Sequence, residues 1–392
     1  MPLGNVVVLD LTRVLAGPFA TSILADFGAS IIKIEPPEGD DARGYGPFIG
    51  EESRYFMGLN RGKQSMTLNL KSSEGQAILK KMVQHADVLV ENYRPGVMDK
   101  FGLSYETLKE INPKLIYAAC SGFGQTGPYR NKSAYDITIQ GIGGIMSVTG
   151  QENGEPTRVG IPFGDVLPGL YLANGILLAL YHRQQTGKGQ MVDVSMLDCQ
   201  VAVMDSHIGK YFSTGIVQKP IGNRHPTVTP LESFKTQDGY VIAAVGNEKT
   251  WEKFCTLLNV SHLLTDERFL TNNLRTKYRD ELKKPLAEVF LTKASAEWIK
   301  LLEETGIPCG IINTIDKVVE DEQVLARDMI VEVNHAVAGK VKMAGVPIKL
   351  SETPGTIQTA SPLLGAHTNE ILQQYFKMDS KKIDELRAMR AI

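Results

Sequence analysis

The sequence has few cysteines and almost no net charge. Its four cysteines are scattered, and no two of them form a Cys-x-x-Cys pair. This usage excludes a disulfide framework and a structural zinc site, and it is typical of proteins in a reducing compartment. The formal net charge of −2 excludes the overall positive field that attracts nucleic acids or an anionic membrane. We therefore expect no metal, no nucleic-acid partner and no membrane partner.

The chain also has little that would direct it to or across a membrane. No basic stretch followed by an apolar one stands at its N-terminus, so we expect no signal peptide. The longest apolar run, Val166–Tyr181, is interrupted by Pro168, Gly169, Asn174 and Gly175, and it is too short for a typical membrane span. With 392 residues, of which 43% are hydrophobic, the chain is long enough for two domains. We expect a cytoplasmic protein.

A third absence concerns nucleotides. The apolar stretch Val6–Leu11 runs into a loop with Ala16-Gly17-Pro18, where a dinucleotide-binding unit would carry Gly-x-Gly-x-x-Gly. A helix over 19–27 and a strand over 29–35 follow. This β-α-β unit predicts a parallel sheet, because parallel strands need such a crossover. We therefore predict an α/β, Rossmann-like architecture without bound NAD.

The alternation of strands and helices continues along the chain. Strands are predicted over 65–70, 86–92, 115–120 and 191–194. Such continuous apolar strands suit a sheet that helices cover on both faces, and ligands of these sheets bind at the carboxyl ends of the strands. A Gly/Pro-bearing connection precedes a hairpin over 234–245 that turns at Asp238-Gly239. We predict three parts: the first part of a large Rossmann-like domain (1–225), a small α+β domain (226–325), and a return segment that completes the large domain (326–392).

One acidic residue stands at the mouth of the longest apolar helix. The pattern predicts a buried helix that starts at Asp165 and ends before Gly187. A carboxylate in this place has two interpretations. It is either the N-cap, which accepts a free backbone N–H, or a nucleophile or general base whose charged form the helix N-terminus favours. Position alone favours the cap.

Several stretches together resemble the class III CoA-transferase family, which includes formyl-CoA and carnitine CoA-transferases. The matching stretches are 8–12, 16–18, 28–35, 86–88, 91–96, 164–165, 186–190, 306–310 and 362–365. They extend over nearly the whole chain, so the resemblance is specific for the family, but it does not name the substrate.

The resemblance implies a large domain built from both chain ends, a small middle domain and an interlocked homodimer. It also implies acyl-CoA (coenzyme A) and a carboxylic acid as substrates, with no tightly bound cofactor. The family's catalytic aspartate falls on Asp165. The family's CoA-contacting positions fall on Val14, Leu15, Ala16, Leu68, Asn69, Leu70, Lys71, Asn92, Tyr93, Arg94, Lys100, Lys132, Ser133, Ala134 and Tyr135.

The chemistry of CoA transfer fits this aspartate. An enzyme carboxylate can accept the acyl group as a mixed anhydride and then carry CoA as a thioester. With a reference pKa of ~3.9, we expect Asp165 to be ionised at neutral pH without a separate base. Arg94, Lys100 and Lys132 are the candidate cations for the phosphates of CoA.

Two alternatives compete with CoA transfer. A 2-methylacyl-CoA racemase needs two acid/base groups, and that branch has a histidine where this chain has Tyr135, a poor base with a reference pKa of ~10. A non-catalytic acyl-CoA-binding protein would have no need of Asp165 between Gly164 and a buried helix. Asp136 either positions groups near Asp165 or caps a helix. Leu15 stands where formyl-CoA transferases carry a glutamine, which argues against formyl-CoA and oxalate as substrates.

Overall fold

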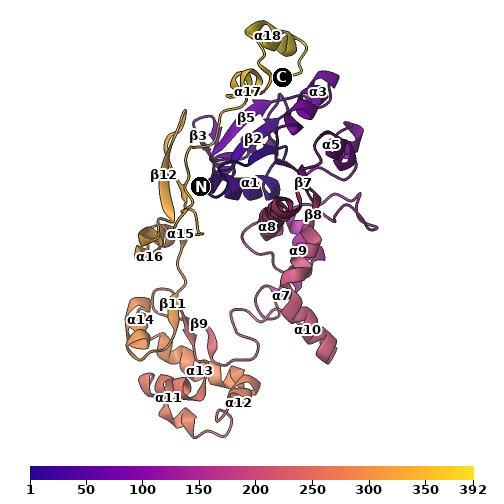
Figure 1. Ribbon diagram of the computed structural model, residues 1–392. Coiled ribbons are helices and arrows are strands. Elements are labelled where there is room, and N and C mark those ends of the chain that lie inside the picture. The colour runs from indigo at the N-terminus through magenta and orange to yellow at the C-terminus, as the bar shows by residue number, and fades with distance from the viewer. The chain divides into compact units, whose positions relative to one another are not determined.

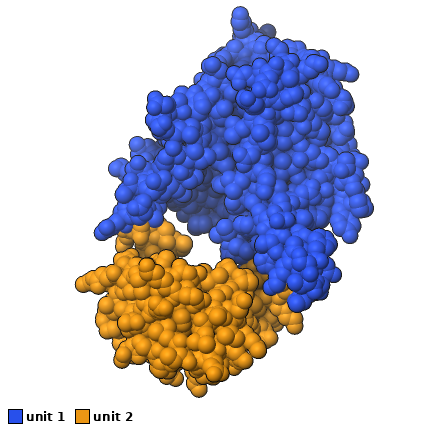
Figure 2. All heavy atoms as spheres, turned by 60° about the horizontal axis from the view of Figure 1, so that its bottom comes forward, with its two compact units in different colours: residues 1–146, 158–216, 322–392 blue, residues 147–157, 217–321 orange.

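The computed structural model describes residues 1–392, which fold into two compact units (Figure 1; Figure 2). Unit 1 contains residues 1–146, 158–216 and 322–392, and unit 2 contains residues 147–157 and 217–321. The predicted boundaries at 225 and 325 therefore lie too far along the chain. The assignment of 147–157 to the large domain was also wrong, because Arg224 pairs with Glu152, and Gly222 donates its N–H to the carbonyl of Gly150 at 2.9 Å.

Unit 1 is built on a six-stranded sheet, which confirms the predicted α/β class. The strands lie in the order β5-β2-β1-β6-β7-β8, and every neighbouring pair is parallel. Their bounds are Val7–Asp10 (β1), Ser30–Glu35 (β2), Lys63–Thr67 (β5), Val88–Glu91 (β6), Ile116–Ser121 (β7) and Met191–Ser195 (β8). The strand predicted over 65–70 was displaced: β5 begins earlier, and Leu68–Lys71 form the loop at its carboxyl end.

Helices cover both faces of this sheet, as continuous apolar strands require. Successive strand residues point to opposite faces, so Val8 and Leu9 belong to different cores. The core of Val8 includes residues of α1 (Ala16–Asp26), α6 (Asp136–Ile142), α8 (Phe163–Thr186) and α9 (Met196–Val203). The core of Leu9 includes residues of α3 (Ser73–Val83), α5 (Tyr105–Ile111), α17 (Thr368–Phe376) and α18 (Ser380–Ala388).

The C-terminal segment returns to the edge of this sheet. Ser65 donates its backbone N–H to His367 Nδ1 at 3.1 Å, and Thr67 donates its N–H to Thr368 Oγ1 at 3.0 Å. Beyond the strand, Asn69 donates its N–H to the carbonyl of Ala391 at 2.8 Å. In Figure 1 the yellow helices α17 and α18 accordingly lie beside β5 and α3.

Helix α8 is only partly buried, so the prediction of a buried helix was wrong for one of its sides. It ends at Gly187, which takes the left-handed conformation (φ 72°). Leu172 and Ile176 are fully buried on the side that packs on α1 and the sheet, but Leu178 is 70% and Tyr181 63% exposed on the other. By length and composition α8 could cross a membrane, which is weak evidence because the core helix of a soluble protein passes the same test.

Unit 2 has its own sheet and core. Strands β9 (Leu231–Lys235) and β10 (Tyr240–Ala244) form the predicted hairpin, and β11 (Cys309–Ile311) pairs with β10 to complete an antiparallel sheet. Helices α11 (Glu248–Leu257), α12 (Asn272–Lys277), α13 (Arg279–Phe290) and α14 (Ser295–Glu304) accompany it. Aromatic rings fill the core, where Phe290 lies 4.4 Å from Phe234 and 4.8 Å from Trp298 between ring centroids.

The remaining elements are mostly short. They are η1 (Asp41–Gly44), β3 (Phe48–Ile49), β4 (Glu52–Ser53), α2 (Arg54–Leu59), α4 (Val97–Lys100), α7 (Ile145–Val148), α10 (Asp205–Thr214), η2 (Ser261–Leu264), α15 (Ile315–Val318), α16 (Glu322–Ala326), and the hairpin β12 (Ile330–His335) with β13 (Gly339–Ala344).

Candidate active site

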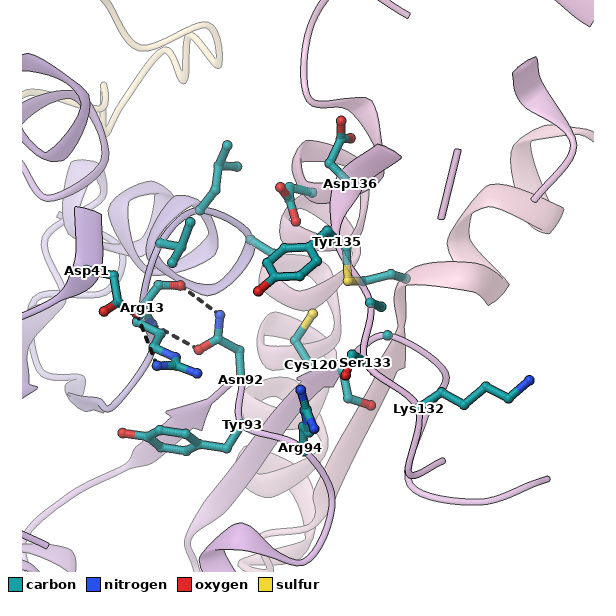
Figure 3. A pocket seen from close by; sticks show the side chains of 18 of the residues that line it. Arg13, Asp41, Asn92, Tyr93, Arg94, Cys120, Lys132, Ser133, Tyr135 and Asp136 are labelled. Carbon is teal, nitrogen blue, oxygen red and sulfur yellow. Dashed lines mark hydrogen bonds and ion pairs between the residues drawn. The ribbon is translucent and has the colours of Figure 1, made fainter. Parts of the chain in front are cut away.

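A cavity of about 330 Å³ lies in unit 1 at the carboxyl ends of β1, β6 and β7 (Figure 3). The loops after these strands form part of its wall, and the segment before α6, the start of α8 and the residues Asp41, Tyr45 and Met196 also line it. The cavity brings together eleven of the sequence-predicted site residues: Val14, Leu15, Ala16, Asn92, Tyr93, Arg94, Lys132, Ser133, Ala134, Tyr135 and Asp165.

A second cavity, of about 300 Å³, adjoins the first. Arg13, Asp41 and Tyr93 line both cavities and so form their common wall. The second cavity collects the remaining predicted loop, Leu68, Asn69, Leu70 and Lys71. Lys100 is exposed at the end of α4 and lines neither cavity, although its neighbour Phe101 lines the second.

Asp165 is the third residue of α8, and its carboxylate is not the helix cap. The N-cap position is Pro162, which has no side chain able to accept a hydrogen bond. The interpretation of Asp165 as an N-cap is therefore wrong. Its carboxylate accepts no hydrogen bond from the protein, and it lies half-buried in the wall of the first cavity.

The cap of α8 comes instead from Asp136, the first residue of α6. Its Oδ1 accepts the backbone N–H of Gly164 at 2.7 Å. The buried side chain of Gln140 holds the same carboxylate, with Nε2 at 2.9 Å from Oδ1 and 3.0 Å from Oδ2. Arg158 Nη1 lies 3.7 Å from Oδ2 of the same carboxylate. Position 164 must be glycine for this approach, because a Cβ there would lie 2.8 Å from the carbonyl oxygen of Asp136.

Burial and a neighbouring charge make the Asp165 carboxylate unusually basic. Burial is the main cause, and the negative charge of Asp136 is the second; together they raise the pKa of Asp165 to about 7. The expectation that Asp165 is fully ionised at neutral pH was therefore wrong. Once it loses its proton, a carboxylate with a raised pKa is a stronger nucleophile than an ordinary aspartate.

Asn92, which lines the first cavity, also has a structural role. Its side-chain amide clamps the backbone of Arg13, accepting the N–H at 2.9 Å and donating to the carbonyl at 2.8 Å. The dashed lines in Figure 3 show this clamp beside the ion pair of Arg13 with Asp41, which measures 3.1 Å. Asn92 therefore joins the loop after β6 to the loop after β1.

Sequence reasoning missed Arg13, a cation that lines both cavities. The signal was present, because Arg13 directly precedes the predicted contact Val14 in the loop after the first strand. The predicted cations Arg94 and Lys132 do line the first cavity, where the Lys132 ammonium lies 3.5 Å from the centre of the Tyr129 ring. Cys120 also lines this cavity, but burial raises the pKa of its thiol, which keeps it protonated and unreactive. No cluster of three or more His, Cys, Asp or Glu side chains could hold a metal ion.

Comparison with known proteins decides the family. The model of CoA-transferase family III matches residues 3–368. The chain belongs to CoA-transferase family III. It is 40% identical over 388 residues to the human succinyl-CoA:glutarate CoA-transferase, covering 98% of this chain and 88% of that protein. It is 43% identical over 352 residues to the acetyl-CoA:oxalate CoA-transferase of Acetobacter aceti, covering 89% of each chain.

The fold agrees with this membership. The crystal structure of a CAIB/BAIF family protein from Brucella suis superposes with a TM-score of 0.88 at 39% identity, covering 96% of this chain and 99% of that one. This family III protein is therefore a transferase that transfers CoA, and the comparisons favour transfer over the racemase and binding-protein alternatives.

Proposed function

We propose that this protein transfers CoA between two carboxylic acids with Asp165 as the nucleophile. The observation that carries the proposal is the state of the Asp165 carboxylate. It has no hydrogen-bond partner in the protein, it has a raised pKa, and it lines the cavity that also holds the predicted CoA contacts. A structural carboxylate would instead be capped or paired, as Asp136 is.

The reaction runs through two kinds of enzyme-bound intermediate. An oxygen of Asp165 attacks the carbonyl carbon of the acyl-CoA thioester, the C–S bond breaks, and CoA leaves as a thiolate while a mixed anhydride forms. The thiolate then attacks the Asp165 carbonyl carbon, which releases the donor acid as a carboxylate and leaves an aspartyl-CoA thioester. The acceptor carboxylate repeats both steps in reverse, so no proton is gained or lost overall.

The cations at the cavity suit anionic substrates. Arg13, Arg94 and Lys132 line it, and they supply positive charge for the phosphates of CoA or for the second carboxylate of a diacid. Both relatives carry diacids in their names, succinyl-CoA with glutarate and acetyl-CoA with oxalate. We therefore assign an acyl-CoA donor and a dicarboxylic or short-chain acceptor. The similarity to a relative named for oxalate means that Leu15 alone does not exclude oxalate as an acceptor.

The exposed side of α8 supports the homodimer that the resemblance implies. Leu178 and Tyr181 on α8 are 70% and 63% exposed in the single chain, and Phe212 on α10 is 81% exposed; large apolar side chains exposed on helices are typical of interfaces. Light scattering should give a dimer that persists on dilution, and Leu178→Glu should weaken it. A monomer of the unmodified chain at low concentration would exclude the dimer.

Covalent trapping tests the nucleophile. The protein is incubated with acyl-CoA alone, and hydroxylamine or borohydride should then mark the peptide that contains Asp165. Asp165→Asn should fold and lose nearly all transfer, because a neutral amide is a far weaker nucleophile. The matched control is Asp198→Asn, which removes an exposed acid from the first turn of α9. This mechanism would be refuted if the unmodified protein gave no adduct on that peptide and the Asp165→Asn variant kept its activity.

A further inference from the structure

Val14 has a backbone conformation that its side chain disfavours. Its φ is 66°, and the other non-glycine residues with positive φ are asparagine, aspartate, lysine or arginine. A β-branched residue in this region is a true outlier, and such strain persists only where the surroundings hold it. Val14 lines the same cavity as Asp165, together with Leu15 and Ala16.

Hydrogen bonds hold the segment Thr12–Val14 at each residue. The carbonyl of Thr12 accepts from Lys33 Nζ at 2.8 Å, and both backbone groups of Arg13 bond to Asn92. The N–H of Val14 donates to Asp40 Oδ1 at 3.0 Å. Gly17 packs against the Thr12 side chain, and a Cβ at position 17 would lie 2.3 Å from it.

Asp40 and Lys33 form a buried ion pair directly behind this segment. Asp40 Oδ2 lies 2.8 Å from Lys33 Nζ, and the two side chains are 1% and 0% exposed. The second oxygen is also committed, because Oδ1 accepts the N–H of Ala42 at 2.9 Å as well as that of Val14. The pair therefore ties both ends of the segment, Thr12 through Lys33 and Val14 through Asp40.

We infer that Asp40 is a positioning residue for CoA transfer. It fixes Val14 in the left-handed conformation and so sets the wall that Val14, Leu15 and Ala16 present to the acyl-CoA thioester beside Asp165. The inference rests on the proposed function and adds to it Asp40, which lines the second cavity but not the cavity of Asp165.

Asp40→Asn is the first test. Asparagine has one acceptor oxygen, so either Lys33 or the Val14 N–H loses its partner. The kcat/KM for the acyl-CoA donor should fall about 10- to 100-fold, the factor that corresponds to the strain of one such residue. In the Val14→Gly background the same change should cost less than about threefold, because glycine takes a positive φ without steric cost. A purely structural Asp40 would give the same loss in both backgrounds.

The matched control is Asp87→Asn at the opposite, amino end of the strands. Asp87 also joins a backbone N–H to a cation, accepting from Val7 at 2.7 Å and pairing with Arg183 at 2.9 Å. This variant should lower the melting temperature and leave the kcat/KM of the folded protein within about twofold, because Asp87 lines neither cavity.

Two results would overturn the inference: wild-type kinetics in Asp40→Asn, or an equal loss in both backgrounds. If Asp40→Asn does not fold, the double variant Asp40→Asn with Val14→Gly provides the test. The inference predicts that this double variant folds and transfers CoA. Its failure to fold would also overturn the inference. Failure of the proposed function looks different, since the unmodified protein would then transfer no CoA or form no adduct on Asp165.

Discussion

Asp136 accepts the backbone N–H of Gly164 and thereby caps α8. Asp165, the residue after Gly164, makes no cap hydrogen bond. Two carboxylates therefore stand close together with unequal surroundings. Asp136 is held by Gly164 and Gln140, with Arg158 nearby, whereas Asp165 has no partner in the protein. Of the two, Asp165 is the carboxylate whose pKa is raised, to about 7, mainly by burial and then by the negative charge of Asp136.

The pH dependence of transfer should reveal this relationship. The nucleophile must be ionised, so kcat/KM should rise with pH through about 7, the pKa of Asp165. The other titratable groups that interact with Asp165 are Asp136 on α6, Tyr55 on α2 and Cys120 on β7. Asp136→Asn keeps the cap but removes its charge, so the acid limb should move to lower pH. Rates measured from pH 5 to 9 that show no shift would contradict this.

Asp165 should make the fold less stable at high pH. Its pKa is about 7 in the folded chain and 3.8 ordinarily, so folding favours the protonated form, and stability is lost as pH rises from about 4 to 7. Asp165→Asn removes this penalty. At pH 8 the variant should be more stable by up to about 4 kcal/mol, and near pH 4 the two should agree. Urea denaturation at both pH values measures the difference, and an equal effect at both would exclude the linkage.

Gly164→Ala should damage the cap and the site together. The new Cβ would lie 2.8 Å from the Asp136 carbonyl oxygen and 2.9 Å from its Oδ1. Such overpacking costs about 1–3 kcal/mol, and it should also reduce transfer because it displaces Asp136. Gly160→Ala is the control, since a Cβ there meets nothing within 4 Å. Equal stability of the two variants in thermal melts would show that the contact is relaxed.

The lysines near the cavities should contribute to CoA binding. Lys132 lines the first cavity, and the exposed Lys100 directly precedes Phe101 in the wall of the second. Alanine at either position should weaken CoA binding by about 1–3 kcal/mol through the loss of one phosphate contact. Lys114→Ala removes an exposed lysine at the amino end of β7 and serves as the control. Calorimetry that finds all three variants alike would remove these lysines from the site.

The sequence predicted those parts of the molecule that depend on local pattern. Continuous apolar runs located β1, β2, β6 and β7, and the loops after them do line the cavities. Charged residues that are buried because they pair with residues distant in the sequence were not predicted. Lys63 precedes the strand predicted over 65–70, yet it begins β5 with 3% exposure, and Asp10 on β1 pairs with it at 2.9 Å.

The same limit explains the two errors at Asp165. A helix-terminal acid can be recognised from sequence, but the residue that caps the helix, Asp136, lies 28 residues before Gly164 and reaches it only through the tertiary fold. The raised pKa follows from that proximity and from burial, neither of which a linear pattern contains. The exposed side of α8 could not be predicted for the same reason. An apolar sequence predicts a buried helix, but it does not show which of its sides the rest of the chain covers.

The return of the chain end to β5 has a consequence for synthesis on the ribosome. All six strands of the large sheet have been made by residue 195, but part of the cover of one face is supplied by residues 368–392. Until those residues emerge, Ile371, Leu372, Ile383 and Leu386 cannot shield the strand residues they pack with, such as Ile34 and Met66. The apolar sheet face therefore stays uncovered while unit 2 is being translated, and unit 1 reaches its final packing only once residues 368–392 have emerged from the ribosome.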